Sequence, residues 1–345
     1  MNLDCPMPKL DFDVITIGHG SGGLLTHKLL DSGVFNVLSN SYLDEEHDGA
    51  ILQLNGKTAF TTDSFVINPI FFPGGNIGDL AVNGTVNDIA MCGAVPKYLS
   101  LSFILEEGLK MEEFWEVLVG IKMACEKVGV QVVTGDTKVV EKGKGDKIFI
   151  NTTGIGVVHE KAKIGISQLK SGDKVIVSDE IATHGISIMS VREGLEFETD
   201  IKSDTRALNH VVQKALDRFG DQIHILRDPT RGGVATVLKE IANKSGLGMH
   251  LDHKLIPVNE SVEGACEMLG LDPLYVANEG VFISIVSPEI ADEYVKLLLE
   301  FESCKHASII GEVTDDHPKK VLMKSAIGGT RVLNLLPGEQ LPRIC

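Results

Sequence analysis

The chain has 345 residues, more than the roughly 250–300 residues that one hydrophobic core supports, so two domains are expected. Acidic residues outnumber basic ones by 48 to 32, and the net charge of −16 argues against nucleic acid and anionic membranes as partners. No apolar run approaches the roughly 20 residues that cross a bilayer, the N-terminus does not resemble a secretion signal, and six scattered cysteines include no C-x-x-C pair. These features predict a soluble, cytoplasmic protein with reduced thiols.

Strand-like and helix-like segments alternate through the first half of the chain. A glycine-rich segment, Gly18–Gly23, follows the short apolar run Val14–Ile17, and a helix that opens near His27 is expected to end at Gly33. Beyond it, the patterns predict strands at 58–62, 130–134 and 148–158, and helices at 77–93 and 111–128, with Gly129 ending the second helix.

A second block follows a polar boundary near residues 161–173. Strands are predicted at 175–178, 223–226 and 281–286, and helices at 206–219, 288–301 and from the N-cap Thr230 to Lys244. Two such blocks with mixed connections favour an α+β fold over one long parallel sheet. The expected division is a glycine-rich segment (1–40), an N-terminal domain (41–160), a C-terminal domain (161–327) and a flexible tail (328–345).

Acidic residues recur beside the apolar runs. Asp63, Asp136 and Asp228 each follow a predicted strand, Asp48 precedes the run 51–54, and Asp88 lies next to Asn87 on a predicted helix. Carboxylates at strand ends can converge on one ligand, and several together suit Mg²⁺, which prefers oxygen ligands. A single aspartate is equally typical of a turn or a cap, so the set carries the prediction rather than any one member.

The glycine-rich segment allows three interpretations. Gly18, Gly20 and Gly23 satisfy the dinucleotide pattern G-x-G-x-x-G, although the run before them is short for the strand that this motif needs. A segment whose N–H groups close over phosphates fits equally well. The third interpretation is a flexible turn.

Three further side chains are candidates for chemistry. Lys138, two residues after Asp136, could neutralise a transferring phosphate, or it is a surface lysine. Arg231 could present its guanidinium to phosphate at a helix N-terminus, or it simply precedes the helix. Cys345 is the last residue of the sequence; its α-carboxylate disfavours the thiolate, Arg343 offsets part of that effect, and an unreactive thiol is the alternative.

Several segments together resemble one known family. They are Phe60–Val66, Phe71–Gly75, Asn83–Met91, Val133–Val140, Asp228–Gly233 and the terminal Pro342-Arg-Ile-Cys345. Across nearly the whole chain they resemble the HypE family of hydrogenase-maturation factors, and the terminal segment is the most specific part. Aminoimidazole ribonucleotide synthetase, selenophosphate synthetase and thiamine-phosphate kinase, of the same superfamily, share the acidic motifs but lack this tail.

The resemblance implies two α/β domains of the PurM-like type, a homodimer formed through the N-terminal domain, and ATP near the subunit interface. It implies Mg²⁺ ligands at Asp48, Asp63, Asp88 and Asp136, and catalytic roles for Cys345, Lys138 and Glu279. The implied ATP-binding residues are Gly20, Ser21, Gly22, Gly23, Asn87, Thr137, Asp228 and Arg231. Asn76 and Val281 depart from the family pattern, which leads us to expect an acid and a lysine at these positions.

The implied activity is an ATP-dependent dehydration. Cys345 would receive a carbamoyl group from the partner HypF, the protein would convert that group to a thiocyanate, and a HypC–HypD complex would accept the cyanide for the iron of a NiFe hydrogenase. Glu279 is the expected general base, with His19 as second choice. The alternatives are a selenophosphate synthetase-like enzyme, a Rossmann oxidoreductase and a non-catalytic carrier of a thiol-bound group. The tail is expected to alternate between docked and released states.

Overall fold

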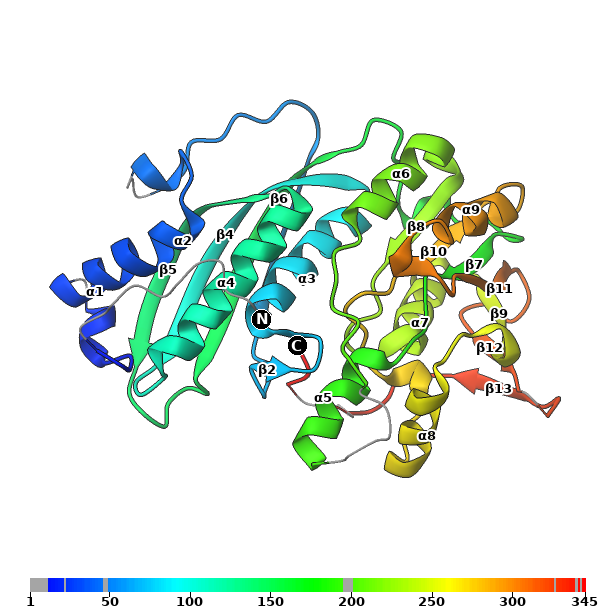
Figure 1. Cartoon of the computed structure of the whole chain (residues 1–345). Helices are drawn as coiled ribbons and strands as arrows, with labels where there is room; N and C mark the ends of the chain where they lie inside the picture. The colour runs from blue at the N-terminus through cyan, green and yellow to red at the C-terminus, as the bar shows by residue number, and fades with distance from the viewer. Residues whose placement is uncertain are drawn as a thin grey trace.

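The structure is a computed structural model that describes residues 12–21, 23–45, 49–194, 201–325, 327–338, 341 and 343–345. Figure 1 shows two halves, each built of one main β-sheet with helices packed against it, and this confirms the predicted α+β class. Among the described residues, no helix combines the length and the apolar character that a membrane span requires.

The N-terminal sheet has four strands in the order β1-β6-β4-β5. The strands are β1 (Thr58–Phe65), β6 (Ile148–Val158), β4 (Ala94–Glu106) and β5 (Gln131–Val140), and β4 and β5 are parallel while the other pairs are antiparallel. Helices α3 (Ile77–Met91) and α4 (Met111–Val128) cover one face, and a short ribbon of β2 (Phe71–Phe72) and β3 (Gly75–Asn76) leads into α3.

Local sequence explains both helices. In α4 the apolar positions Phe114, Trp115 and Leu118 are buried, and Gly129 ends the helix in the left-handed region at φ 82°, as predicted. Helix α3 is buried nearly all round because it lies between the sheet and the second half of the chain. Asn76, the first departure from the family pattern, caps α3 by accepting the N–H groups of Gly78 and Asp79.

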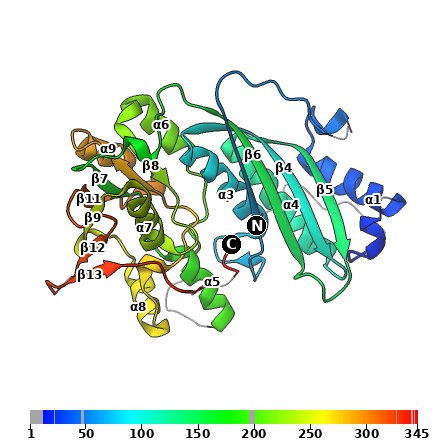
Figure 2. The ribbon, with the colours of Figure 1, turned by 180° about the vertical axis from the view of Figure 1, so that it is seen from behind.

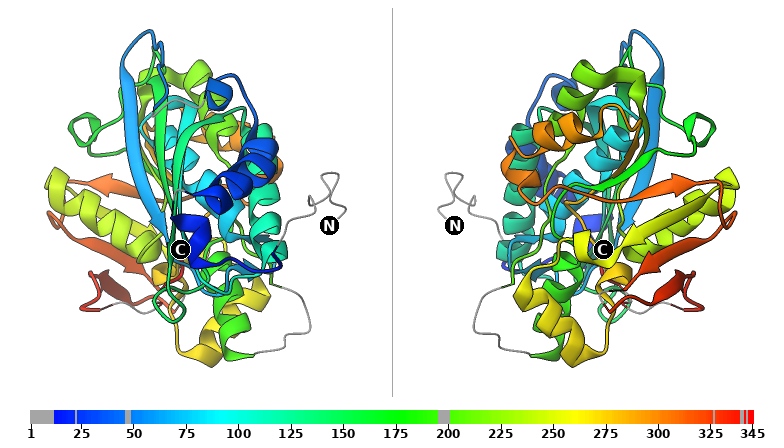
Figure 3. Two further views of the ribbon diagram at one scale, coloured as in Figure 1. Left: turned by 90° about the vertical axis from the view of Figure 1, so that its left-hand side faces the viewer. Right: turned by 90° about the vertical axis from the view of Figure 1, so that its right-hand side faces the viewer.

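The other face of the N-terminal sheet is open. Figure 2 views the molecule from behind, with β4, β5 and β6 in front of α3 and α4, and the end-on view in Figure 3 places α1 and α4 on the same side of the sheet. Phe60 and Ile104 point outward from this face and are 67% and 45% exposed. Apolar side chains on an open sheet face are typical of an interaction surface.

The C-terminal sheet has seven strands in the order β13-β12-β9-β11-β7-β10-β8. In chain order these are β7 (Lys174–Val177), β8 (Ile223–Arg227), β9 (Gly248–Asp252), β10 (Ile283–Val286), β11 (Ser308–Thr314), β12 (Val321–Lys324) and β13 (Thr330–Leu333). Its helices are α5 (Thr183–Glu193), α6 (Asn209–Phe219), α7 (Gly233–Ser245), α8 (Glu260–Leu269) and α9 (Ala291–Leu298). Helices α6 and α9 pack in one apolar cluster, whereas α5, α7 and α8 join the main core.

Short helical turns complete the described chain. They are η1 (Ile17–Gly20), η3 (Leu43–Glu45), η4 (Ile166–Gln168), η5 (Gly220–Gln222), η6 (His253–Leu255), η7 (Pro273–Tyr275) and η8 (Glu302–Cys304).

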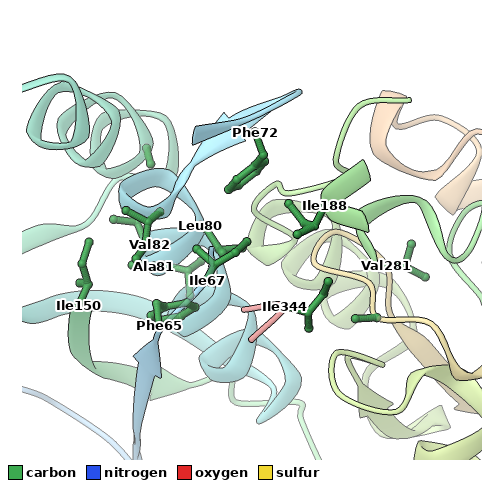
Figure 4. Close-up of a cluster of buried hydrophobic side chains, with 14 of the residues drawn as sticks. Phe65, Ile67, Phe72, Leu80, Ala81, Val82, Ile150, Ile188, Val281 and Ile344 are labelled. Carbon is green, nitrogen blue, oxygen red and sulfur yellow. The ribbon is translucent and has the colours of Figure 1, made fainter. Parts of the chain in front are cut away.

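One hydrophobic core crosses the boundary between the halves. Phe65 and Ile67 from the N-terminal half, and Ile188 and Val281 from the C-terminal half, belong to the same buried cluster. Ile344 lies between them in Figure 4 and is 3% exposed. The last residues of the chain therefore fill the contact between the two halves. Val281, the second departure from the family pattern, is a fully buried core residue.

Several predicted boundaries were wrong. The first helix runs past Gly33 as α1 (Leu24–Leu29), a π-helical turn η2 (Leu30–Phe35) and α2 (Asn36–Leu38), because Gly33 is packed inside it. Thr230 does not cap α7; Gly232 precedes this helix, with φ 73°. The segment predicted as tail begins with β13, and the long central strand β4 was not predicted.

Candidate functional site

Three carboxylates meet where the two halves face each other. Asp63 comes from β1, Asp88 from α3, and Asp228 follows β8. Thr61 donates a hydrogen bond of 2.8 Å to Asp88, and the Arg231 guanidinium lies 3.9 Å from Asp63. We call Asp63, Asp88 and Asp228 the carboxylate cluster.

The carboxylate cluster binds protons more tightly than ordinary aspartates do. Burial and the neighbouring Asp88 raise the pKa of Asp228 to about 7. Burial also raises the pKa values of Asp63 and Asp88, and the negative charge of Asp63 adds to the shift at Asp88. Like charges that are held together in a desolvated place favour a cation or bound protons.

Glu279 lies against this cluster in the loop before β10. Its side chain is 3% exposed, and its Oε1 atom has no hydrogen-bond partner. Burial and the charges of Asp204 and the carboxylate cluster raise its pKa well above the usual value. This environment favours the protonated form of Glu279, and a cation entering the site would favour the carboxylate that can act as a base.

The backbone around Glu279 is held by residues from both halves. Asp204 accepts the N–H groups of Glu279 and Gly280, and Arg206 donates to the Gly280 carbonyl at 3.0 Å. The Asn87 side chain donates to the carbonyls of Arg206 and Glu279 and accepts the N–H of Leu208. Asn87, predicted to bind the cofactor, thus uses its amide to join the two halves.

The fit to a metal ion is partial. Within the described part of the chain, no three His, Cys, Asp or Glu side chains are arranged to hold a metal ion by themselves. The carboxylate cluster nevertheless supplies hard oxygen donors, and Mg²⁺ is usually bound by one or two carboxylates together with water and phosphate. Asp48, the fourth predicted ligand, lies outside the described residues.

Asp136 and Lys138 lie elsewhere in the same protomer. They form an ion pair on β5 at 2.5 Å, with both side chains more than half exposed. Strands β6 and β4 separate β5 from β1, so Asp136 lies about 14 Å across the sheet from Asp63. Asp63 pairs with Thr152, which in turn pairs with Leu101, and both of these side chains are buried on the side of the sheet that the helices cover. Asp136 pairs with Ser102, whose side chain lies on the open face. One protomer therefore does not bring these acids together.

A cavity of about 450 Å³ lies between β5 and the N-terminal helical segment. Leu30, Val34 and Phe103 give it an apolar wall, and Thr137 and Lys138 contribute polar groups. An apolar pocket of this size with a few polar groups is typical of a small-molecule site.

The glycine-rich segment packs against β5 beside this cavity. A Cβ atom at Gly20 would lie 2.5 Å from the Val139 nitrogen, so glycine is required for this close approach. Ser21 donates to the Gly18 carbonyl at 3.0 Å, and Gly23 precedes α1. Gly22 lies outside the described residues. Because Val14 makes a single β-bridge and no strand precedes the glycines in the described segment, the Rossmann interpretation is wrong.

His19, the second choice for a base, is engaged locally. Its ring is 4% exposed, and its Nδ1 atom accepts the N–H of Thr16 at 3.0 Å. Burial lowers the pKa of His19, which favours the neutral ring that caps η1.

Arg231 is presented by a glycine turn. Gly232 and Gly233 both have positive φ, and a Cβ atom at Gly233 would lie 2.5 Å from the Leu274 carbonyl oxygen. The turn leaves the Arg231 side chain 69% exposed at the start of α7. A guanidinium and a helix N-terminus together suit an anion.

The end of the chain docks on the segment that follows β1. The Cys345 main-chain oxygen accepts the N–H of Val66 at 3.0 Å, and Val66 is three residues after Asp63 on the same segment. Leu341 and Ile344 line a second cavity of about 380 Å³ together with Arg231. The structure therefore places the partly exposed Cys345 against the segment that follows β1, while the neighbouring Ile344 shares a cavity with Arg231.

Sequence reasoning missed the residues that hold Glu279 and Cys345. Asp204 and Arg206 fix the Glu279 loop, while His184 and Arg192 contact the tail. Their partners lie 74 to 160 residues away, so no local motif marks them.

The carboxylate cluster should make stability depend on pH. Asp228 has a folded-state pKa of about 7, above the unfolded value of about 3.9, so its unfavourable contribution grows as pH rises between these values. Without nucleotide, we expect Asp228→Asn to raise the free energy of unfolding at pH 8 by roughly 1–3 kcal/mol, and by less at pH 5. Urea unfolding at both pH values measures this. Asp221→Asn is the control, since Lys163 lowers the pKa of Asp221, and destabilisation by Asp228→Asn at pH 8 would contradict the prediction.

Comparison with known proteins agrees with this geometry. Family models described as AIR synthase related protein match residues 46–158 (N-terminal domain) and 170–324 (C-terminal domain). A carbamoyl dehydratase HypE of Azotobacter vinelandii is 48% identical over 342 residues, covering 98% of this chain and 100% of that protein. The HypE of Escherichia coli K12 is 42% identical over 337 residues, covering 96% of this chain and 99% of that protein.

Solved structures extend the comparison. A hydrogenase maturation protein HypE in complex with ATP superposes with a TM-score of 0.92 at 46% identity, covering 95% of this chain and 99% of that one. A chain of a HypE–HypF complex gives 0.79 at 43% identity, covering 91% and 100%. A thiamine monophosphate kinase of Aquifex aeolicus, at 20% identity and a TM-score of 0.55 over 76% and 87%, shares the fold alone. By full-length identity and fold, the chain belongs to the HypE family of carbamoyl dehydratases.

Proposed function

We propose that this protein uses ATP to dehydrate a carbamoyl group carried on the sulfur of Cys345, giving a thiocyanate for hydrogenase maturation. The observation that carries the proposal is the docking of Cys345 beside Val66, at the end of the strand that supplies Asp63. From this docking position the thiol would reach the carboxylates and the arginine that suit a phosphoryl-transfer site. The activity named for the full-length relatives agrees with it.

The chemistry balances with one ATP. In R–S–C(=O)–NH₂ the oxygen is a poor leaving group, and transfer of the terminal phosphoryl group of ATP to it releases ADP and makes it a good one. Loss of the nitrogen protons and cleavage of the C–O bond then give R–S–C≡N and phosphate. The protein supplies positioning, positive charge from Lys138 and Arg231, and proton transfer through Glu279.

ATP is expected in the cavity beside β5, with its phosphates toward Lys138. The relative solved with ATP supports nucleotide binding, and Gly20, Ser21, Gly23 and Thr137 lie along this cavity or next to it. Mg²⁺ would be held by Asp63, Asp88 and Asp228 together with the phosphates, and would supply charge neutralisation. The oxygen donors and their raised pKa values support this assignment.

A homodimer through the open sheet face would complete the site. Asp63 and Lys138 occupy opposite edges and opposite faces of one sheet, so a site that uses both draws them from two protomers. The exposed Phe60 and Ile104 on this face support burial against a second copy.

Three further assignments complete the proposal. HypF would load the carbamoyl group, which the solved HypE–HypF complex of a relative supports. A HypC–HypD complex would accept the cyanide, as the family resemblance implies. The protein would act in the cytoplasm, where thiols such as Cys92, Cys125, Cys266 and Cys304, which form no disulfide, stay reduced.

The test is ADP formation by the isolated, carbamoylated protein. We expect Cys345→Ala to abolish ADP formation on ATP–Mg²⁺ addition, because it removes the group that accepts the phosphoryl, while the Kd for ATP stays unchanged. Cys92→Ala, which removes an exposed thiol at the end of α3, should behave as wild type. ADP formation by Cys345→Ala at the wild-type rate would contradict the proposed function.

A further inference from the structure

We propose that residues 343–345 are held by a C-terminal latch, made of Val66, Asp146, His184 and Arg192, that positions Cys345 whatever group its sulfur carries. The inference rests on the proposed function, in which that sulfur is loaded and then converted.

The N-terminal half contributes one side of the C-terminal latch. Val66 pairs with the tail twice, because its N–H donates to the Cys345 oxygen at 3.0 Å and its carbonyl accepts from Arg343 Nε at 3.1 Å. The Arg343 guanidinium also pairs with Asp146, in the loop before β6, at 2.5 Å and lies over the Phe149 ring at 5.9 Å.

The C-terminal half contributes the other side through α5. The fully buried His184 donates from Nε2 to the Ile344 carbonyl at 2.8 Å, while its Nδ1 accepts from the Ser203 hydroxyl at 2.7 Å. Arg192 donates to the Arg343 carbonyl and also to Asn68 of the N-terminal half. Residues 343–345 thus bridge the two halves by polar contacts, in addition to the burial of Ile344.

These contacts use parts of the tail that the reaction leaves unchanged. The contacts described above hold the main-chain oxygens of residues 343, 344 and 345 and the Arg343 guanidinium. A thiol, a thiocarbamate and a thiocyanate differ at the sulfur and leave all four groups intact. The C-terminal latch can therefore present substrate and hold product in the same register, and the reacting carbon stays at one place through both steps.

Arg343 is the side chain on which the C-terminal latch depends most. Its charge faces Arg192, whose pKa is lowered by burial and by Arg343, and Asp146 offsets that repulsion. Removing the Arg343 charge loses the Asp146 pair and the Val66 bond together, whereas the buried Ile344 remains. Arg343 is thus a positioning residue that acts through the main chain.

The experiment is residue-resolved amide hydrogen exchange on the full-length protein without nucleotide. Because the Val66 amide is bonded to the tail, its exchange rate reports docking. We expect Arg343→Gln to speed Val66 exchange at least tenfold and to leave the Leu99 amide in the central strand β4 unchanged. Arg331→Gln is the matched control, because Arg331 pairs with Asp272 at 2.6 Å and is 46% exposed, against 41% for Arg343.

A second part of the experiment tests whether docking of residues 343–345 is independent of the group on the Cys345 sulfur. Iodoacetamide adds a neutral amide to Cys345 that mimics the carbamoyl group, and we expect Val66 exchange to stay within about twofold of the unmodified rate. The C-terminal latch is refuted if Arg343→Gln exchanges like wild type, or if alkylation speeds Val66 exchange as much as Arg343→Gln does. Neither measurement uses ATP or turnover, so the exchange rates test the C-terminal latch even if the proposed function is wrong.

Discussion

Glu279→Gln is expected to slow ADP formation by the carbamoylated protein about 10²- to 10⁴-fold while leaving the Kd for ATP within about threefold of wild type. Glu279 is buried against the carboxylate cluster with its Oε1 unpaired, so it is placed to exchange a proton with the reacting group. Glutamine keeps the size and shape of the glutamic acid side chain and adds no charge to the buried position, so the fold is preserved. Single-turnover kinetics and equilibrium ATP binding measure the two effects separately.

Glu312→Gln provides the control for this prediction, because Glu312 pairs with Lys174 on the surface of the C-terminal sheet. Glu312→Gln should change neither the rate of ADP formation nor the Kd for ATP. If Glu279→Gln weakened ATP binding and left turnover intact, Glu279 would be a binding contact, and proton transfer would have to be assigned elsewhere.

A mixture of two inactive variants is expected to recover activity. Asp63→Asn and Lys138→Ala should each be nearly inactive as homodimers. Co-expressed in equal amounts, they should regain about a quarter of wild-type activity, since half of the dimers are mixed and each mixed dimer has one intact site of two. The physical reason is that Asp63 and Lys138 lie on opposite faces of one sheet, so only the proposed dimer could bring them into one site.

The matched control mixes Asp63→Asn with Asp88→Asn. Both residues belong to the carboxylate cluster of one chain, so each site of a mixed dimer still lacks one carboxylate and stays inactive. Equal, near-zero activity from both mixtures would contradict a site shared between protomers.

Local features of the fold could be predicted from the sequence. The apolar spacing of α4 and its glycine stop depend only on neighbouring residues, and the helix 111–128 was predicted as observed. The central strand β4 was missed, and Thr230 was predicted as a cap where the chain needs two glycines of positive φ, Gly232 before α7 and Gly233 at its first position. The strand β4 and the glycine turn at α7 depend on tertiary packing, which a local sequence pattern does not contain.

The candidate site was predicted as a set of residues but not as an arrangement. The acidic motifs gave Asp48, Asp63, Asp88, Asp136 and Asp228 as candidates to converge on one ligand, and the structure brings Asp63, Asp88 and Asp228 together. The position of Asp136 depends on β6 and β4 pairing between β1 and β5, and no local pattern encodes that strand order. Asn87 and His184 likewise acquire their roles only when the two halves and the tail meet.

Intact-protein mass spectrometry tests the central claim most directly. The protein is loaded with a carbamoyl donor and its transferase, isolated, and then given ATP–Mg²⁺. We predict that the group on Cys345 loses about 18 Da, the mass of one water, only when ATP is present, and that Cys345→Ala gains no group. A carbamoyl group that stays unchanged with ATP, or one that never appears on Cys345, would contradict the dehydratase account and favour a carrier.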